Sequence, residues 1–219
     1  MEIAGRAPLT YALVGANIAI FILTFIGIGP AVTDPRFRGV APLIVQFGVL
    51  VPAVQHGEVW RLLTAGFLHF DIAHVSFNML ALYQVGLYCE PRFGTPRFAA
   101  IYVSALLGGD VAALLTSGPS TVTAGASGAV MGAFGAMAAH AIRHHHAEAL
   151  RGAAIPIAFT LVNGLTRAGI SNAAHVGGLV AGVIVAAVLR APRFGADLNE
   201  RPAEESWSGD ASKTPRSDL

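Results

Sequence analysis

The stretch "TVTAGASGAVMGAFGAMAAH", residues 121–140, passes at Ser127 from an uncharged loop into an almost wholly apolar helix. The chain as a whole has a similar character. Of its 219 residues, 54% are hydrophobic and only 12% are charged, whereas about a quarter of the residues are charged in a typical soluble protein. The composition therefore predicts an all-α polytopic membrane protein.

Long apolar runs recur along the chain and approach the roughly 20 residues that a helix needs to cross a bilayer. We predict six transmembrane helices, at residues 9–28, 72–88, 96–115, 127–142, 151–166 and 173–190. The second, fourth and fifth are short for a full crossing, so we expect local thinning, tilt or partly buried loops there. The sequence thus divides into a membrane domain, residues 1–190, and a polar tail, residues 191–219, which is expected to be disordered.

Charge and cysteine content restrict the function classes. A formal net charge of +1 argues against a nucleic-acid partner. The single cysteine, Cys89, allows no internal disulfide and has no companion for a metal site.

Positively charged residues predict the orientation, because cytoplasmic loops carry more of them. With a cytoplasmic N-terminus, ten of the 14 Lys and Arg residues fall on the cytoplasmic side and four on the other. We therefore expect both termini in the cytoplasm. Short, even cytoplasmic loops and an Ala-rich, Arg-dominated composition indicate a bacterial inner membrane. The longest connection, residues 29–71, then lies outside, and its prolines and Trp60 suit an irregular segment at the interface.

This topology places four polar side chains in the outer half of the membrane. They come from three predicted helices: His74 and Asn78, Ser127, and His175. Polar groups are expensive in hydrocarbon, so such a group of residues indicates a functional site or a buried polar cluster.

The setting of Ser127 suits a nucleophile. A helix N-terminus has free N–H groups and a positive dipole end that can stabilise an oxyanion. The neighbouring glycines, Gly125 and Gly128, let backbone and substrate approach closely. The alternative is a serine that only bonds the carbonyl of the preceding turn.

His175 is the best-placed base for this serine. In "NAAHVGGLVAG", residues 172–182, small residues recur every four positions, and Gly128 and Gly132 have the same spacing. This spacing allows close helix contact, which would bring an imidazole to a hydroxyl. The alternative is a histidine that serves packing, since such spacing is common in membrane helices.

His74 and Asn78 lie four residues apart and so share one face of a helix. Together they could donate hydrogen bonds to a developing oxyanion beside the Ser127 N–H. An ordinary polar contact between helices is the alternative.

These residues carry a family resemblance. "GASG" at 125–128, "HFDIAHVSFN" at 69–78, "WR" at 60–61 and "AHVGGLVAG" at 174–182 resemble the signature segments of the rhomboid intramembrane serine proteases, in the family's order. The resemblance implies a six-helix, rhomboid-like bundle around a water-filled active-site cavity that opens to the outer face.

The resemblance also implies residue roles. Ser127 matches the nucleophile and His175 the general base of a dyad without an acidic third member. The oxyanion-hole positions correspond to His74 and Asn78, with Gly125 and the Ser127 N–H lining the same hollow. Three further positions are implied. His69 matches a histidine near the site, Trp60 and Arg61 match the loop after the first helix, and Glu90 matches a structural acid.

The implied activity is cleavage of the transmembrane segments of single-span membrane proteins, with no metal or cofactor. The client and the oligomeric state stay open. A relative that binds clients without cutting them is the first rival, although that class is expected to lack the serine or the histidine. A small transporter is the second, but the sequence shows no paired interrupted helices in corresponding halves.

Two other polar features remain. His144, His145 and His146 could bind a metal, but a solvated loop between charged residues is the preferred interpretation. Asp110 lies within the third predicted helix, where we expect a hydrogen bond that faces the bundle.

Overall fold

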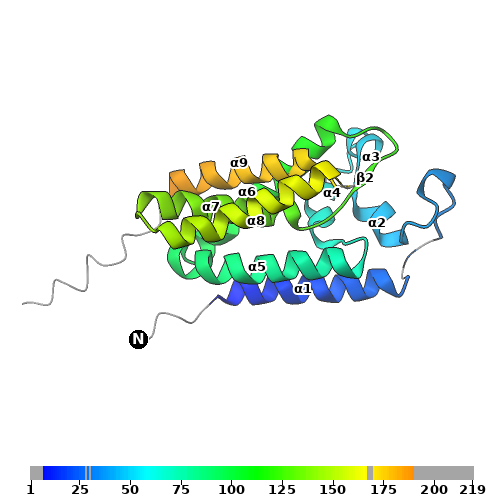
Figure 1. Cartoon of the computed structure of the whole chain (residues 1–219). Coiled ribbons are helices and arrows are strands. Elements are labelled where there is room, and N and C mark those ends of the chain that lie inside the picture. The colour runs from blue at the N-terminus through cyan, green and yellow to red at the C-terminus, as the bar shows by residue number, and fades with distance from the viewer. Residues whose placement is uncertain (1–6, 28, 30, 167–169, 190–219) are drawn as a thin grey trace, which may run out of the picture.

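The computed structural model describes residues 7–27, 29, 31–166 and 170–189, and the predicted tail, residues 191–219, lies outside this part. Long helices run side by side in a bundle (Figure 1). Within the described part, six helices have 17 to 22 residues, and each corresponds to one predicted span: α1 (Pro8–Phe25), α5 (Ile72–Phe93), α6 (Thr95–Thr116), α7 (Ser127–Arg143), α8 (Ala147–Thr166) and α9 (Asn172–Leu189).

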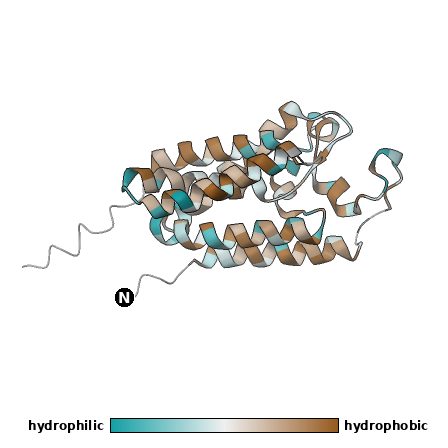
Figure 2. Ribbon diagram, viewed as in Figure 1, coloured by the Kyte–Doolittle hydropathy of each residue, from teal (hydrophilic) through white to brown (hydrophobic). Residues whose placement is uncertain are grey.

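The apolar character of these helices differs. Among the described residues, three helices, α1, α6 and α9, are long and apolar enough to cross a membrane. Of the others, α7 has 17 residues, α5 has polar residues in its first half, and α8 has charges in its first two turns. Hydrophobic residues follow the lengths of the helices, and many of the hydrophilic ones lie near their ends (Figure 2). Six crossings therefore stay a prediction.

The second and fifth helices are longer than predicted. α5 continues to Phe93, and α8 already begins at Ala147. Glu90 explains the first difference, because its carboxylate, in a residue only 1% exposed, accepts hydrogen bonds from the Leu9 N–H (3.0 Å), the Thr10 N–H (2.8 Å) and the Thr10 hydroxyl (2.7 Å). These N–H groups belong to the first turn of α1, which leaves its donors without partners in the helix. The charge is thus satisfied inside the bundle and does not end the helix.

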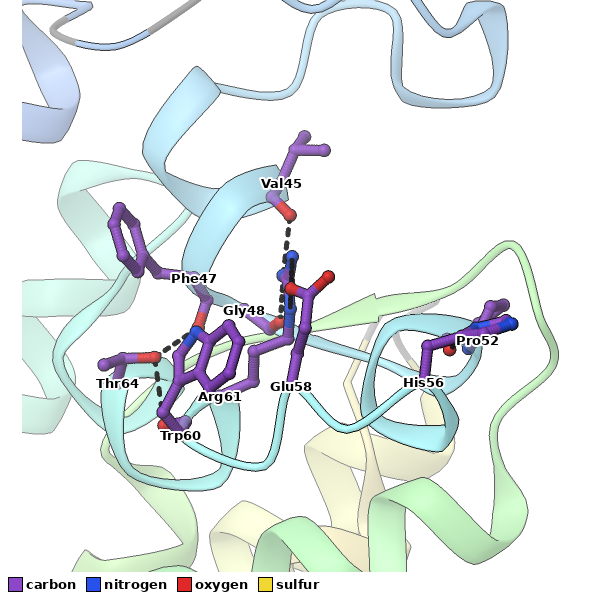
Figure 3. Close-up of polar contacts among 9 residues, drawn as sticks. All are labelled: Val45, Phe47, Gly48, Pro52, His56, Glu58, Trp60, Arg61 and Thr64. Carbon is purple, nitrogen blue, oxygen red and sulfur yellow. Dashed lines mark hydrogen bonds and ion pairs between the residues drawn. The ribbon is translucent and has the colours of Figure 1, made fainter.

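The connection between α1 and α5 folds into short elements. They are η1 (Pro35–Phe37), α2 (Pro42–Phe47), β1 (Val49–Leu50), α3 (Val51–Gln55), α4 (Arg61–Thr64) and η2 (Ala65–Phe67). Arg61, at the start of α4, is 6% exposed and joins α4 to the end of α2. Its guanidinium donates to the carbonyls of Val45 (2.8 Å) and Gly48 (2.9 Å) and forms an ion pair with Glu58 (2.7 Å), as Figure 3 shows.

A short β-ladder joins this connection to the segment before α7. β1 pairs in antiparallel fashion with β2 (Val122–Thr123), with Val49 opposite Thr123 and Leu50 opposite Val122. The ladder was not predicted, because two-residue strands have no periodicity for a sequence to reveal. It fixes the loop that leads into Ser127.

The close approach that the small residues predict between the fourth and sixth spans is confirmed. A Cβ placed on Gly178 or Gly182 of α9 would collide with the backbone oxygen of Gly128 or Gly132 of α7, respectively. We call these four residues the glycine seam. On its other side, Gly132 faces Ala105 of α6, so three helices meet at backbone distance.

Candidate active site

Ser127 is the first residue of α7, and its side chain is half-buried. The residue before it, Ala126, is fully buried, and its carbonyl accepts the hydrogen bond from Val130 that opens the helix. The N–H groups of the first turn therefore point toward the N-terminus of α7, where the Ser127 hydroxyl lies, and have no partners within the helix. This end carries the positive part of the helix dipole.

His175 lies in the first turn of α9, and its Nε2 is 3.0 Å from the Ser127 Oγ, within hydrogen-bond distance. The glycine seam produces this distance, because two helices that touch through their backbones place the side chains beside the seam within reach of each other. His175 is 4% exposed, and among the described residues its Nδ1 has no hydrogen-bond partner. The ring is thus oriented by packing and by Ser127, with no carboxylate behind it in this part of the chain.

Gly125 lies close to both the His74 ring and the Ser127 hydroxyl. Its φ of 135° lies in the region that favours glycine, and a Cβ there would come within 2.8 Å of the His74 ring. Its N–H donates to the carbonyl of Ala65 in η2 at 2.9 Å. What Gly125 supplies is therefore space for the His74 ring, since its own donor is already engaged.

His74 is fixed at the start of α5. Asp71 caps this helix, and its carboxylate accepts the His74 N–H at 2.7 Å. The His74 ring stacks on Phe70 with the ring centroids 6.0 Å apart, and it meets the edge of His69 at 4.8 Å. The stacking of Phe70 was not predicted from the sequence, whereas the predicted start of this helix, at residue 72, agrees with the structure.

Asn78 is buried one turn further along α5, and its side-chain amide donates to the His74 carbonyl at 3.0 Å. An amide nitrogen carries two hydrogens, so one donor of Asn78 is used within its own helix and the other is not needed for this bond. The structure thus brings Ser127 and His175 into direct contact, places Gly125 beside both Ser127 and His74, and bonds Asn78 to His74.

His69 lies outside the long helices and is fully buried. Burial, together with the neighbouring His74, lowers the pKa of His69 to about 3. The ring is therefore neutral around pH 7, and it packs against His74 as an uncharged group.

The remaining polar features are placed as follows. Within the described part of the chain, no group of three or more His, Cys, Asp or Glu side chains has an arrangement that could hold a metal. His145 and His146 are exposed, but His144 is half-buried and stacks on His140 at 4.4 Å, so the preferred interpretation as a solvated loop was wrong for this residue.

Asp110 is buried, but its Oδ2 has no hydrogen-bond partner among the described residues, so the expected bond is missing at this atom. The outer cavity stays a prediction.

Comparison with known proteins identifies the family. Residues 56–192 match the family described as "Rhomboid domain". The rhomboid protease GluP of Bacillus subtilis (strain 168) is 35% identical over 196 residues, which are 88% of this chain and 37% of GluP. RHOMBOID-like protein 5 of Arabidopsis thaliana is 36% identical over 149 residues, 65% of this chain and 48% of that protein. The rhomboid protease AarA of Providencia stuartii is 29% identical over 209 residues, 83% of this chain and 72% of AarA.

The chain therefore spans less than half the length of the first two of these relatives. It belongs to the rhomboid family, whose members are integral membrane proteins.

Proposed function

We propose that this rhomboid-family protein is an intramembrane serine endopeptidase that cleaves the transmembrane segments of single-span membrane proteins through Ser127 and His175. The observation that carries the proposal is the 3.0 Å hydrogen bond between the Ser127 Oγ and the His175 Nε2 at the N-terminus of α7. A serine hydroxyl is a weak nucleophile, and an adjacent imidazole is what activates it.

The proposed reaction begins with acylation of the serine. Nε2 of His175 takes the hydroxyl proton while the Ser127 Oγ attacks the carbonyl carbon of a peptide bond in the client. The carbonyl oxygen becomes an oxyanion, and the bond to the peptide nitrogen then breaks as His175 returns the proton to the leaving amine. Water, deprotonated by the same imidazole, attacks the acyl-serine, releases the new carboxyl terminus and restores the hydroxyl.

Donors at the start of two helices would stabilise the oxyanion. The Ser127 N–H opens α7, and the His74 ring lies beside Gly125, whose missing Cβ leaves room for it. The free hydrogen of the Asn78 amide is a third donor. Each such donor, held in place before reaction, contributes about 2.7–4 kcal/mol of transition-state stabilisation in enzymes where it has been removed.

We also propose the membrane setting. The six long helices would cross a bacterial inner membrane with both termini in the cytoplasm, so that Ser127 and His175 lie in the outer half. The distribution of arginine and lysine supports this orientation. No metal or cofactor takes part in the proposed reaction.

Labelling with a serine-reactive fluorophosphonate tests the proposal directly. The purified protein in mild detergent should be labelled, and both Ser127→Ala and His175→Ala should abolish the label. Ser76→Ala is the matched control, because Ser76 is an exposed serine on α5 close to His74 and should not affect labelling.

If the wild type stays unlabelled while a known rhomboid protease labels alongside it, the proposal fails. The protein would then be read as a client-binding relative that does not cut.

A further inference from the structure

A second candidate site lies at the opposite end of the bundle, where α7 turns into α8 (Figure 1). A cavity of about 240 Å³ opens there between the ends of α5, α7 and α9. One part of its lining is polar and is formed by His140, Arg143 and His144. The other part is apolar, with Phe93 at the end of α5 and two alanines of α9, Ala186 and Ala187.

The polar lining offers hydrogen-bond donors. Nε2 of His144 is buried and has no hydrogen-bond partner among the described residues. His140 uses Nδ1 in a 3.0 Å hydrogen bond with the Tyr88 hydroxyl, which leaves its Nε2 for another partner. Arg143 is exposed, and its guanidinium has only donors. A ligand that fits these groups is an acceptor with several oxygens.

Two arginines at this end, Arg92 and Arg143, form no ion pair with another described residue. Neither of the salt bridges found in the described residues involves Arg92 or Arg143. Arg92 lies 3.8 Å from the centre of the Tyr88 ring and donates to the Tyr88 carbonyl at 2.9 Å, so it is held beside the ring that contacts His140. The buried carboxylate of Glu90 is occupied by donors of α1.

A helix C-terminus usually disfavours an anion, because its last carbonyls are free. Here N–H groups of the loop that follows α7 donate to three of these carbonyls. The N–H of His144 donates to the His140 carbonyl (3.1 Å), the N–H of His146 to the Ala141 carbonyl (2.9 Å), and the N–H of His145 to the Ile142 carbonyl (3.3 Å). An anion at the cavity therefore meets guanidinium and imidazole groups at a helix end where three of the last four carbonyls already accept hydrogen bonds from the loop.

We propose that this cavity binds the phosphate headgroup of an anionic phospholipid. The headgroup would accept hydrogen bonds from Arg143, His140 and His144, and the glycerol and upper acyl chain would lie against Phe93 and the alanines. Next in sequence to lining residues, Ile142 is 61% exposed and Val188 is 73% exposed. The apolar part of the lining favours a lipid over free phosphate, and basic pockets between helices on the positively charged side of membrane proteins bind lipid headgroups in this way.

Native mass spectrometry of the full chain in neutral detergent tests this proposal without using enzymatic activity. The protein is titrated with phosphatidylglycerol and, separately, with zwitterionic phosphatidylcholine. We expect one phosphatidylglycerol to bind at least about fivefold more tightly than phosphatidylcholine, since one basic residue near an anionic headgroup contributes about that factor. Equal affinity for the two lipids would overturn the proposal.

Matched variants locate the binding. Arg143→Gln should weaken phosphatidylglycerol binding about fivefold, and adding His144→Gln should weaken it further. Arg151→Gln removes the same charge from an exposed position of α8 outside the cavity lining and should leave the affinity unchanged. An equal loss in Arg151→Gln, or no loss in Arg143→Gln, contradicts the assignment.

Inorganic phosphate distinguishes the two sources of the anion. If the site takes a lipid, millimolar phosphate should not displace bound phosphatidylglycerol. Displacement at that concentration would identify free phosphate as the ligand and overturn the proposal.

Discussion

Two helix pairs in this protein are held together by opposite means. α7 and α9 meet at the glycine seam, where no side chain separates the backbones. α1 and α5 are joined at one end by the carboxylate of Glu90, which bonds the first turn of α1 and also accepts the Thr95 hydroxyl (2.8 Å). The seam fixes the distance between its two helices at two points one turn apart, whereas one carboxylate fixes a single point. The pair that carries Ser127 and His175 is the one with the stricter geometry.

The largest expected effect is that of Ser127→Ala on the cleavage rate, and it distinguishes a catalytic role of Ser127 from a packing role. Ser127→Ala should lower the cleavage rate of a model single-span client by at least about 10⁴-fold, because loss of a nucleophile removes the covalent route. The thermal unfolding midpoint should stay within error of the wild type, since one half-buried hydroxyl contributes little to the seam. Rate and midpoint are measured on the same preparation. Persistent cleavage would exclude Ser127 as the nucleophile, and a large drop in the midpoint would make it part of the packing.

Asn78→Ala should reduce the rate by at most about 10²- to 10³-fold, as expected for one oxyanion donor. A Km that stays unchanged while kcat falls would place the loss in the transition state. Phe77→Ala, at an exposed neighbouring position, is the control. An unaltered rate in Asn78→Ala would show that Asn78 only donates its hydrogen bond to the His74 carbonyl and plays no part in the reaction.

Gly178→Ala tests the seam itself. The new methyl would collide with the Gly128 backbone oxygen, which cannot move aside as a flexible side chain can, so we expect a loss of about 1–3 kcal/mol in stability and reduced labelling of Ser127. Gly15→Ala in α1 is the matched control, because a methyl there meets nothing within 4 Å. It should leave stability unchanged or slightly raised. If both variants behave alike, the seam does not set the geometry.

Glu90→Gln should cost about 1.5–3 kcal/mol, because it removes the charge from several hydrogen bonds at once. Labelling of Ser127 in the protein that remains folded should be unchanged, since the residue lies outside the α7–α9 pair. Denaturation monitored by circular dichroism in detergent gives the stability. A loss of labelling larger than the loss of folded protein would show that the α1–α5 pair also positions the site.

Much of this architecture was accessible from the sequence, because long apolar runs and small residues at a spacing of four are local patterns. They gave the places of the long helices and the approach of α7 to α9. The extent of α5 was not accessible, since it depends on Glu90 meeting donors some 80 residues away. The stacking of His144 on His140 and the contact of Gly125 with His74 likewise depend on tertiary packing.

The bond between Ser127 and His175 joins residues 48 positions apart, and His175 belongs to the last long helix that the structure describes. During synthesis the ribosome releases α7 well before α9, so in the proposed membrane setting Ser127 would enter the bilayer before His175 is available to it. On the proposed mechanism, a nascent chain that still lacks α9 would not cleave the membrane proteins beside it during insertion, because Ser127 has no base. The order of translation would thus delay the proposed activity until α9 has joined the bundle.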